Sequence, residues 1–217
     1  MGVYIDSLAH VSALARLGDG TKVWSFSRVL DRAVIGDHCQ LGQNVFVDRD
    51  VVIGNRVKIQ NNVSVYTGVT VADGVFLGPS CVFTNVTFPR AFIERKHELS
   101  PTMLERGVTV GANATIVCGV HLGEFSLVGA GSVVTRSTAP FALVVGVTAE
   151  RIGWVCACGE RLSPGEAPRA ECGRCGLAYH MDADGCRPAE PAAFERWWQR
   201  QMTGDRPDRL TVSTSHA

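Results

Sequence analysis

An apolar residue returns at every sixth position through the first part of this chain. The anchors are Ile5, Val11, Leu17, Val23, Val29, Ile35, Leu41, Val47, Ile53, Ile59, Val65, Val71, Leu77 and Phe83. A period of six fits neither the alternation of a β-strand nor the 3.6-residue repeat of an α-helix. It predicts a solenoid of short parallel strands, in which three strands make one coil and the anchors stack inside.

Small or β-branched residues four places after the anchors complete the expected interior, and they include Cys39 and Cys81. We expect both cysteines to be small apolar residues of the core. Glycine directly follows many anchors, for example at Gly36, and we expect it to supply the positive φ of a tight corner. The repeat starts again at Val110, which places an insertion at about residues 86–107.

Composition limits the classes of function. The 217 residues carry 21 basic and 21 acidic side chains, so the formal net charge is zero. Without a clustered basic face, we expect neither nucleic acid nor a membrane surface as a partner. No signal-peptide pattern and no run of about 18 apolar residues occurs, so we expect a cytoplasmic protein. In that reducing compartment, the eight cysteines favour metal and core roles over disulfides.

Several segments occur in the order typical of one family: KIQNNVSVYTGV at 58–69, then GPSCVFTNV, PRA, SPT, GANATIVCGV, GAGSVV and ALVVG. Over about residues 3–163 the chain therefore resembles the hexapeptide N-acetyltransferases of nucleotide-linked 3-amino sugars. Their acceptors are a UDP-linked 2-acetamido-3-amino-glucuronic acid and dTDP-linked 3-amino-3,6-dideoxyhexoses, and the segment GWVCACGERL resembles the glucuronate type more. The resemblance implies an all-β, left-handed parallel β-helix, acetyl-CoA as co-substrate, and a homotrimer with its sites between subunits.

The resemblance also implies site residues. Asn85 is expected beside the reacting amine, where its amide would orient the nitrogen lone pair. Substrate contacts are expected from Gln60, Asn61, Asn62, Tyr66, Thr84, Arg90 and Lys96, and coenzyme A contacts from Ala112, Asn113, Ala130, Arg136 and Arg151. From the repeat alone, residues 60–62 would instead be a polar corner with stacked amides, Asn85 a turn out of the coil, and the basic insertion a solvated loop.

Acetyl transfer from a thioester to an amine needs a neutral amine, close placement and donors for the developing oxyanion. A sugar amine with a pKa of about 7.7–8.0, like an α-amino group, is partly neutral at cellular pH, so a strong base is not required. We expect His38 and His121 in corners of the coils and His97 in the insertion. His97 is the best of these as a base, but the sequence assigns none.

Other functions stay open at this level. The same repeat permits O-acetyl transfer and transfer of longer acyl groups. A trimer of the carbonic anhydrase type would need three histidines around one interface zinc, and the histidines lack that spacing. A non-catalytic trimer that binds nucleotide sugars is favoured only by departures from the family pattern, at Ser25, Arg28, Val147 and Thr148.

Two close pairs of cysteines follow the repeat, and they are Cys156, Cys158, Cys172 and Cys175. This spacing predicts a tetrahedral structural Zn²⁺ site in a small ribbon, with glycine N–H groups bonding the sulfurs. His180 and Cys186 are alternative ligands. The segment PAAFERWWQRQM predicts a short amphipathic helix that packs through its aromatic residues. The expected division is a β-helix at 1–153, a Cys₄ module at 154–187, and the helix with a disordered tail at 188–217.

Overall fold

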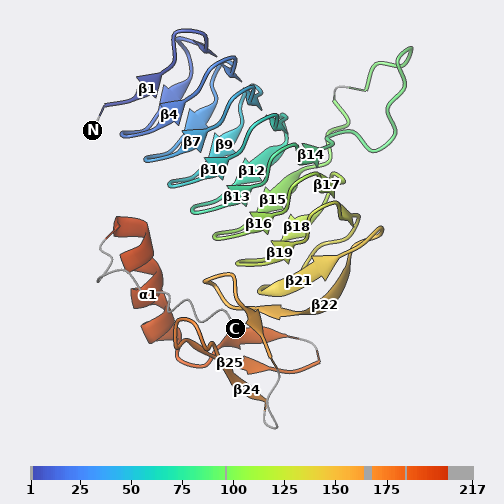
Figure 1. Ribbon diagram of the computed structural model, residues 1–217. Helices are drawn as coiled ribbons and strands as arrows, with labels where there is room; N and C mark the ends of the chain where they lie inside the picture. Colours follow the sequence, from blue (N-terminus) through green and yellow to red (C-terminus); the bar gives the residue numbers. More distant parts are fainter. Residues whose placement is uncertain (1, 96, 164–167, 184, 205–217) are drawn as a thin grey trace, which may run out of the picture.

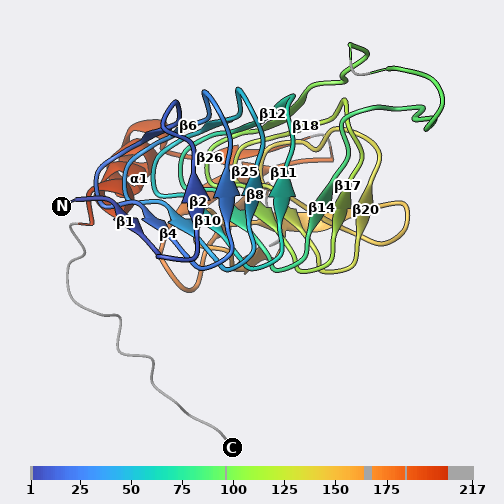
Figure 2. The same ribbon diagram turned by 90° about the horizontal axis from the view of Figure 1, so that it is seen from above.

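The computed structural model describes residues 2–95, 97–163, 168–183 and 185–204. Its body is a parallel β-helix built from three long sheets, with a loop projecting from one side and a smaller C-terminal region at one end (Figures 1 and 2). This arrangement confirms the predicted all-β parallel β-helix with a protruding loop. Among the described residues, no helix is long and apolar enough to cross a membrane. The cytoplasmic location stays a prediction.

Each coil contributes one short strand to each sheet. Sheet A contains β1 (Tyr4–Ile5), β4 (Lys22–Val23), β7 (Gln40–Leu41), β10 (Lys58–Ile59), β13 (Phe76–Leu77), β16 (Thr109–Val110), β19 (Leu127–Val128), β21 (Ala142–Val145), β22 (Glu150–Val155) and β23 (Arg161–Leu162). Sheet B contains β2 (His10–Val11), β5 (Arg28–Val29), β8 (Phe46–Val47), β11 (Ser64–Val65), β14 (Val82–Phe83), β17 (Thr115–Ile116) and β20 (Val133–Val134). Sheet C contains β3 (Arg16–Leu17), β6 (Val34–Ile35), β9 (Val52–Ile53), β12 (Val69–Val71), β15 (Thr102–Leu104) and β18 (His121–Leu122).

The register between coils is 18 residues, or three hexapeptides. Lys22 pairs with Gln40, and Gln40 pairs with Lys58. Each strand therefore turns its anchor inward and the preceding residue outward. The turns form three ridges along the solenoid: the AB corner (24–27, 42–45, 60–63, 78–81, 111–114 and 129–132), the BC corner (30–33, 48–51, 66–68, 84–101, 117–120 and 135–137) and the CA corner (18–21, 36–39, 54–57, 72–75, 105–108, 123–126 and 139–141).

The anchors form one continuous core. Those from Val23 to Phe83 are at most 2% exposed, whereas Ile5 in the first coil is 45% exposed because no coil covers it. Cys39 and Cys81 are buried in this core, as predicted. Burial raises the pKa of Cys39 to about 11 and that of Cys81 to about 12, so both thiols stay protonated at neutral pH.

The glycines after the anchors have a different role from the one predicted. Positive φ occurs three residues after the anchors, at Arg56, Asn62 and Gly74 for example, and Gly36 and Gly42 do not adopt it. A Cβ on Gly42 would instead lie 2.5 Å from Asn61 Oδ1 in the next coil. Close approach of successive coils, and not the left-handed conformation, excludes side chains there.

The protruding loop is shorter than expected. It leaves the solenoid after β14, folds back through bridges between Val86 and Leu99 and between Arg90 and Ile93, and ends before β15. Because Thr102 pairs with Val69 of β12, the coils resume at residue 102, inside the insertion predicted at 86–107. Leu104 is thus an additional anchor, and it is fully buried.

The C-terminal region begins as a continuation of sheet A. Antiparallel pairs join β21 to β22 and β22 to β23, and a separate sheet contains β24 (Arg169–Glu171), β25 (Ala178–Met181) and β26 (Cys186–Pro188). Helix α1 (Pro191–Thr203) follows, which confirms the predicted helix. It starts with proline at its first position and ends at Gly204 in the left-handed conformation. The tail predicted to be disordered lies, from residue 205 on, outside the described residues.

Helix α1 turns back along the CA corner toward the N-terminal coils (Figure 1). Its Phe194 ring lies 5.8 Å from that of Phe141, the Trp198 ring lies 5.1 Å from that of Phe125, and Gly204 lies beside Arg56. This helix thus covers one of the three ridges and leaves the AB and BC corners accessible.

Candidate functional site

The Gln-Asn-Asn triplet at 60–62 lies on the AB corner. Asn61 Oδ1 accepts the backbone N–H of Gln43 at 2.9 Å, and Asn62 Oδ1 accepts from Asn44 Nδ2 at 3.0 Å. Both amides therefore belong to a hydrogen-bonded ladder between coils, as the polar-corner interpretation expected. This ladder stabilises the corner whether or not a ligand is bound.

Gln60 differs from its counterpart one coil earlier, Gly42. Asn61 Oδ1 fills the space beside Gly42 where a side chain would lie. One coil later, Pro79 stands in the place of Asn61, and proline has no side-chain oxygen to fill the corresponding space beside Gln60. A side chain is therefore tolerated at position 60. Gln60 borders a surface cavity of about 380 Å³, called the AB cavity below, which is lined by Trp24, Ser25, Gln40, Gly42, Gln43, Ile59, Gln60 and Asn61.

Three of the other predicted residues, Tyr66, Thr84 and Asn85, lie on the BC corner. Tyr66 is half-buried there, with its ring 6.0 Å from that of Phe46. In the next coil, Thr84 Oγ1 accepts the Cys118 N–H at 2.9 Å, and Asn85 Nδ2 donates to the Thr67 carbonyl at 3.5 Å. The last bond is long for an N–H···O pair, so it holds the Asn85 amide only weakly.

Asn85 also stands at the base of the protruding loop. Its carbonyl accepts the Ser100 N–H at 3.0 Å, and Ser100 Oγ lies 3.0 Å from Thr87 Oγ1. These bonds close the loop at its base. Asn85 is thus both the turn out of the coil and a half-buried amide at a surface corner, so the two interpretations of this residue are compatible.

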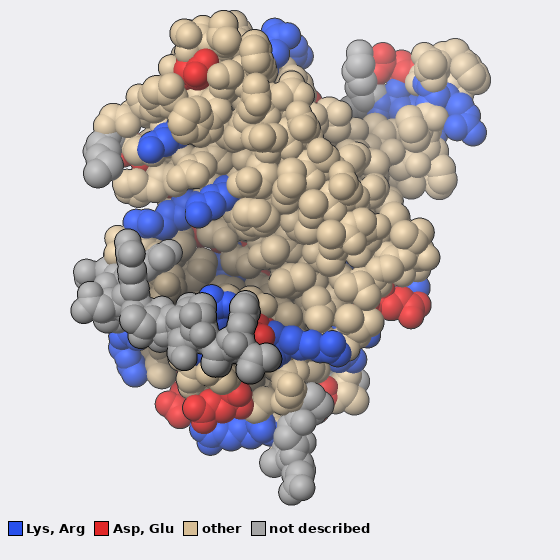
Figure 3. All heavy atoms as spheres, in the orientation of Figure 1, with Lys and Arg blue, Asp and Glu red and all other residues tan. Residues whose placement is uncertain are grey.

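The loop projects charged side chains away from the coils (Figure 3). Phe88 and Phe92 are 70% and 84% exposed, and Arg90 donates to the Pro89 carbonyl at 3.0 Å. In this chain alone, Arg90 therefore lies apart from the AB cavity. Lys96, the remaining residue predicted to contact substrate, lies outside the described residues.

The residues predicted to contact coenzyme A lie on three parts of the molecule. Ala112, Asn113 and Ala130 lie on the AB corner, in the later coils of the ridge that carries residues 60–62, and Arg136 lies on the BC corner. Arg151 belongs to β22, where its guanidinium lies 4.2 Å from the Trp154 ring centroid and donates to the Ala183 carbonyl at 2.6 Å. In the described fold, these contacts hold the Arg151 side chain within the C-terminal region.

One histidine is placed differently from the prediction. His121 lies on the outward side of β18, not in a corner, with Nε2 2.9 Å from Glu105 Oε1. The repeat already contained this signal, because the residue before an anchor faces outward. His38 lies in a corner as expected, and His97 is 75% exposed on the loop.

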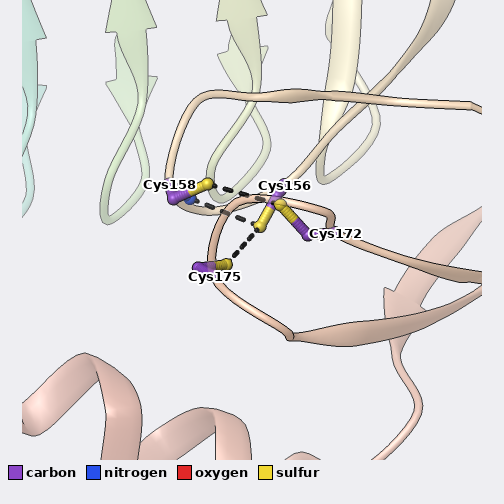
Figure 4. Close-up of side chains that lie close together, drawn as sticks. All are labelled: Cys156, Cys158, Cys172 and Cys175. Carbon is purple, nitrogen blue, oxygen red and sulfur yellow. Dashed lines mark hydrogen bonds between the residues drawn. The ribbon is translucent and has the colours of Figure 1, made fainter. Parts of the chain in front are cut away.

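The four predicted cysteine ligands converge between two hairpins (Figure 4). Their sulfur atoms all lie within 4.8 Å of one another, and the pairs Cys156–Cys175 and Cys158–Cys172 are 3.4 and 3.6 Å apart. A tetrahedron with Zn–S bonds of about 2.3 Å has S···S edges of about 3.8 Å, so the four thiols fit this ion.

The surroundings of the sulfurs differ in detail from the prediction. Gly159 and Gly176 donate to the carbonyls of the first cysteine of each pair, both at 2.8 Å, and not to sulfur. The Cys156 sulfur instead receives the Cys158 N–H at 3.5 Å and lies 3.1 Å from the Tyr179 hydroxyl. Among the described residues, the possible metal cluster contains neither alternative ligand, His180 nor Cys186.

Known proteins with the same repeat match large parts of this chain. The family models described as bacterial transferase hexapeptide (six repeats) and hexapeptide repeat of succinyl-transferase match residues 50–85, and residues 32–67 and 101–136, respectively. The dTDP-3-amino-3,6-dideoxy-alpha-D-galactopyranose 3-N-acetyltransferase of Aneurinibacillus thermoaerophilus is 48% identical over 147 residues, which cover 68% of this chain and 76% of that enzyme. The chain therefore belongs to the family of hexapeptide-repeat N-acetyltransferases that contains this amino-sugar enzyme. The predicted enzyme class, an acyltransferase, is confirmed.

Solved structures also resemble the chain. A hexapeptide-repeat acetyltransferase from Vibrio cholerae, complexed with acetyl coenzyme A, is 25% identical with a TM-score of 0.49, over 64% of this chain and 70% of that chain. A mutant of the GDP-perosamine N-acetyl transferase from Caulobacter crescentus, in complex with CoA and GDP-perosamine, is 23% identical with a TM-score of 0.46, over 70% of this chain and 56% of that chain.

Proposed function

We propose that this protein transfers the acetyl group of acetyl-CoA to the 3-amino group of a nucleotide-linked amino sugar. The 48% identity to a 3-N-acetyltransferase, over 76% of that enzyme, carries this proposal. The name of the relative favours a dTDP-linked 3-amino-3,6-dideoxyhexose as acceptor over the UDP-linked glucuronate that the segment GWVCACGERL favoured. The product would enter the synthesis of a polysaccharide or a glycosylated metabolite.

The chemistry places few demands on the protein. The neutral amine attacks the thioester carbonyl, and the tetrahedral intermediate expels the coenzyme A thiolate while the nitrogen loses its proton to solvent. The Asn85 amide is suited to accept an amine N–H and so aim the nitrogen lone pair, since among the described residues its side chain makes only a 3.5 Å hydrogen bond to Thr67. Placement, and not a strong base, would then supply most of the rate.

A complete site requires a second copy of the chain in this proposal. The AB cavity and the BC corner with Asn85 lie on different ridges of one molecule, with sheet B between them. Outward apolar side chains lie on the sheets that meet at the BC corner: Val52 and Met103 on sheet C and Val82 on sheet B are 40–48% exposed. Such a face favours packing against another copy. A homotrimer would bring the AB corner of one subunit to the BC corner of the next, and coenzyme A would lie along the later coils.

We further propose that Cys156, Cys158, Cys172 and Cys175 hold a structural Zn²⁺. The mutual distances of the sulfurs and the Cys₄ donor set support this ion. Four protein ligands leave no position for water, so the ion would stabilise the fold and take no part in acetyl transfer. The division into a β-helix at 1–153, a Cys₄ module at 154–187 and a C-terminal segment at 188–217 stays a proposal with it.

Thiol release from acetyl-CoA tests the reaction. We expect turnover with a dTDP-3-amino-3,6-dideoxyhexose or with UDP-2-acetamido-3-amino-glucuronate, and none with the corresponding 3-hydroxy sugar. Asn85→Ala should lower kcat about 100-fold through loss of placement. His121→Gln removes the imidazole that Glu105 orients, and it should leave kcat unchanged because the amine needs no placed base. Turnover of the 3-hydroxy sugar with a His121 dependence would support O-acetyl transfer, and no turnover with either amine would refute the proposal.

A further inference from the structure

We propose that the ion in the four-cysteine centre holds helix α1 on the CA corner, so that the metal-free protein releases this helix while the coils stay folded. The inference rests on the zinc site proposed above and assigns it a mechanical role.

The ion would join two hairpins that connect to different parts of the molecule. Cys156 and Cys158 lie between β22 and β23, and β22 pairs with β21 of the last coil. Cys172 and Cys175 lie between β24 and β25, in the sheet whose last strand leads into α1. The metal centre therefore links the solenoid to the part of the chain that carries the helix.

Tyr179 connects the centre to the aromatic residues that seat the helix. It is fully buried, its hydroxyl lies 3.1 Å from the Cys156 sulfur, and the same oxygen accepts the Ala157 N–H at 3.1 Å. Its ring lies 5.4 Å from the Phe141 ring and 6.5 Å from the Phe194 ring. A displaced Cys156 would move Tyr179, and with it the contact between the last coil and α1.

The helix matches the ridge that it covers. A helix of 13 residues is about 20 Å long, and the four coil spacings from Phe141 to Arg56, each about 4.8 Å, add to about 19 Å. Polar and apolar contacts alternate along this length. Glu195 accepts from Arg106 at 2.7 Å, and the Arg106 guanidinium lies 5.6 Å from the Phe125 ring centroid.

These contacts are too few to fix the helix without support from its base. Phe194 and Trp198 are its buried residues, whereas the Arg106–Glu195 pair is 34% and 44% exposed and is therefore screened by solvent. The region from β23 to α1 is also too small to build a core of its own. A metal cross-link at the start of this region is the device that small modules commonly use.

Hydrogen exchange with mass spectrometry, combined with metal analysis, tests the inference on the full-length protein. We expect one Zn²⁺ per chain as purified. After chelation, the amides of residues 191–203 should exchange at least tenfold faster, while those of residues 40–80 keep their protection. Cys172→Ser should reproduce both results. Cys186→Ser is the matched control, because this cysteine is buried in the same region but lies outside the cluster, and it should change neither metal content nor exchange.

A third variant separates the link from the ion. Tyr179→Phe keeps the ring and removes the hydroxyl beside the Cys156 sulfur, so metal should stay bound while α1 exchanges faster than in the wild type. If zinc is lost but the exchange of α1 does not change, the mechanical role is overturned, whereas the proposal of a structural zinc site still stands. A protein without bound metal whose helix is nevertheless protected would overturn both. Iron in place of zinc, with a helix that chelation releases, would overturn the choice of ion and support the mechanical role.

Discussion

Substitution of Gly74 by alanine tests how closely helix α1 approaches the coils. Gly74 lies on the CA corner with φ +67°, and a Cβ built there would lie 2.5 Å from the Trp198 Cη2 atom. Trp198 is only 9% exposed, so its ring has no free space toward which it can move without losing contacts. Alanine at position 74 must therefore displace this part of the helix.

The expected magnitude has two parts. Alanine in the left-handed conformation costs about 1–2 kcal/mol. Displacing Trp198 removes a share of the about 3–5 kcal/mol that a buried aromatic side chain contributes, which we take as about 2 kcal/mol. Gly131→Ala is the matched control, because Gly131 has φ +68° and nothing within 4 Å of its ideal Cβ.

Hydrogen exchange of the α1 amides measures the second part directly. Gly74→Ala should raise their exchange about 30-fold, the equivalent of about 2 kcal/mol at 1.4 kcal/mol per factor of ten. Gly131→Ala should leave them unchanged and lower only the stability of its own coil. Similar α1 exchange in the two variants would refute the steric argument. So would a Trp198→Ala background in which Gly74→Ala still accelerated exchange 30-fold, since no ring would remain to be displaced.

Two further predictions concern the corners and pH. Asn61→Ala should lower the free energy of unfolding by about 1 kcal/mol, because it removes the acceptor of the corner hydrogen bond. Gly42→Ala should cost more, because its Cβ would lie 2.5 Å from Asn61 Oδ1 and also 2.9 Å from the Asn61 backbone nitrogen, and the double variant should cost less than the sum of the two in a denaturant-unfolding cycle. Hydrogen bonds from Gln199 and from Arg106 lower the pKa of Glu195. A carboxyl with a lowered folded pKa contributes stability above its unfolded pKa of about 4.3 and loses it as pH falls further. The exchange of the α1 amides, corrected for its intrinsic pH dependence, should therefore rise below about pH 4 in the wild type and not in Glu195→Gln. Bound metal is measured at each pH as a control. Equal pH profiles in the two proteins would exclude the Arg106–Glu195 pair as the cause.

Most of the solenoid could be predicted because its core is a one-dimensional pattern. Counting in sixes identified each buried anchor from Val23 to Phe83, and the 18-residue register follows from three strands per coil. The predicted end of the protruding loop lies too late in the chain, because the anchor series that resumes at Val110 omits Leu104. The role of glycines such as Gly42 was also misjudged, because contacts between coils depend on backbone spacing that a sequence does not display.

The candidate site could be predicted only as a set of residues. Asn62 and Asn85 come from two motifs of one family, yet the 18-residue register assigns them to different corners, which a resemblance to family motifs does not reveal. The seat of helix α1 was not predicted, because its contacts join residues far apart in the sequence. Phe125 and Phe141 carry a local signal, because each places an aromatic side chain at a corner position where small or polar residues are more common along this chain, but Phe26 shares this feature and lies on another corner.

The two ends of the solenoid differ in a way that limits polymerisation. Strands β1, β2 and β3 pair on one side only within the described residues, and Ile5 and Leu8 are 45% and 59% exposed there. At the opposite end, antiparallel β22 and β23 extend sheet A, and isolated bridges to Thr138 and Val147 follow the last strands of sheets C and B, β18 and β20. Exposed strand edges are templates for adding further chains, but a fibre needs such an edge at both ends of each molecule. Copies that meet through their first coils would use the same strand edges, those of β1, β2 and β3, in both molecules, so any further strand addition would have to occur at the differently built opposite end.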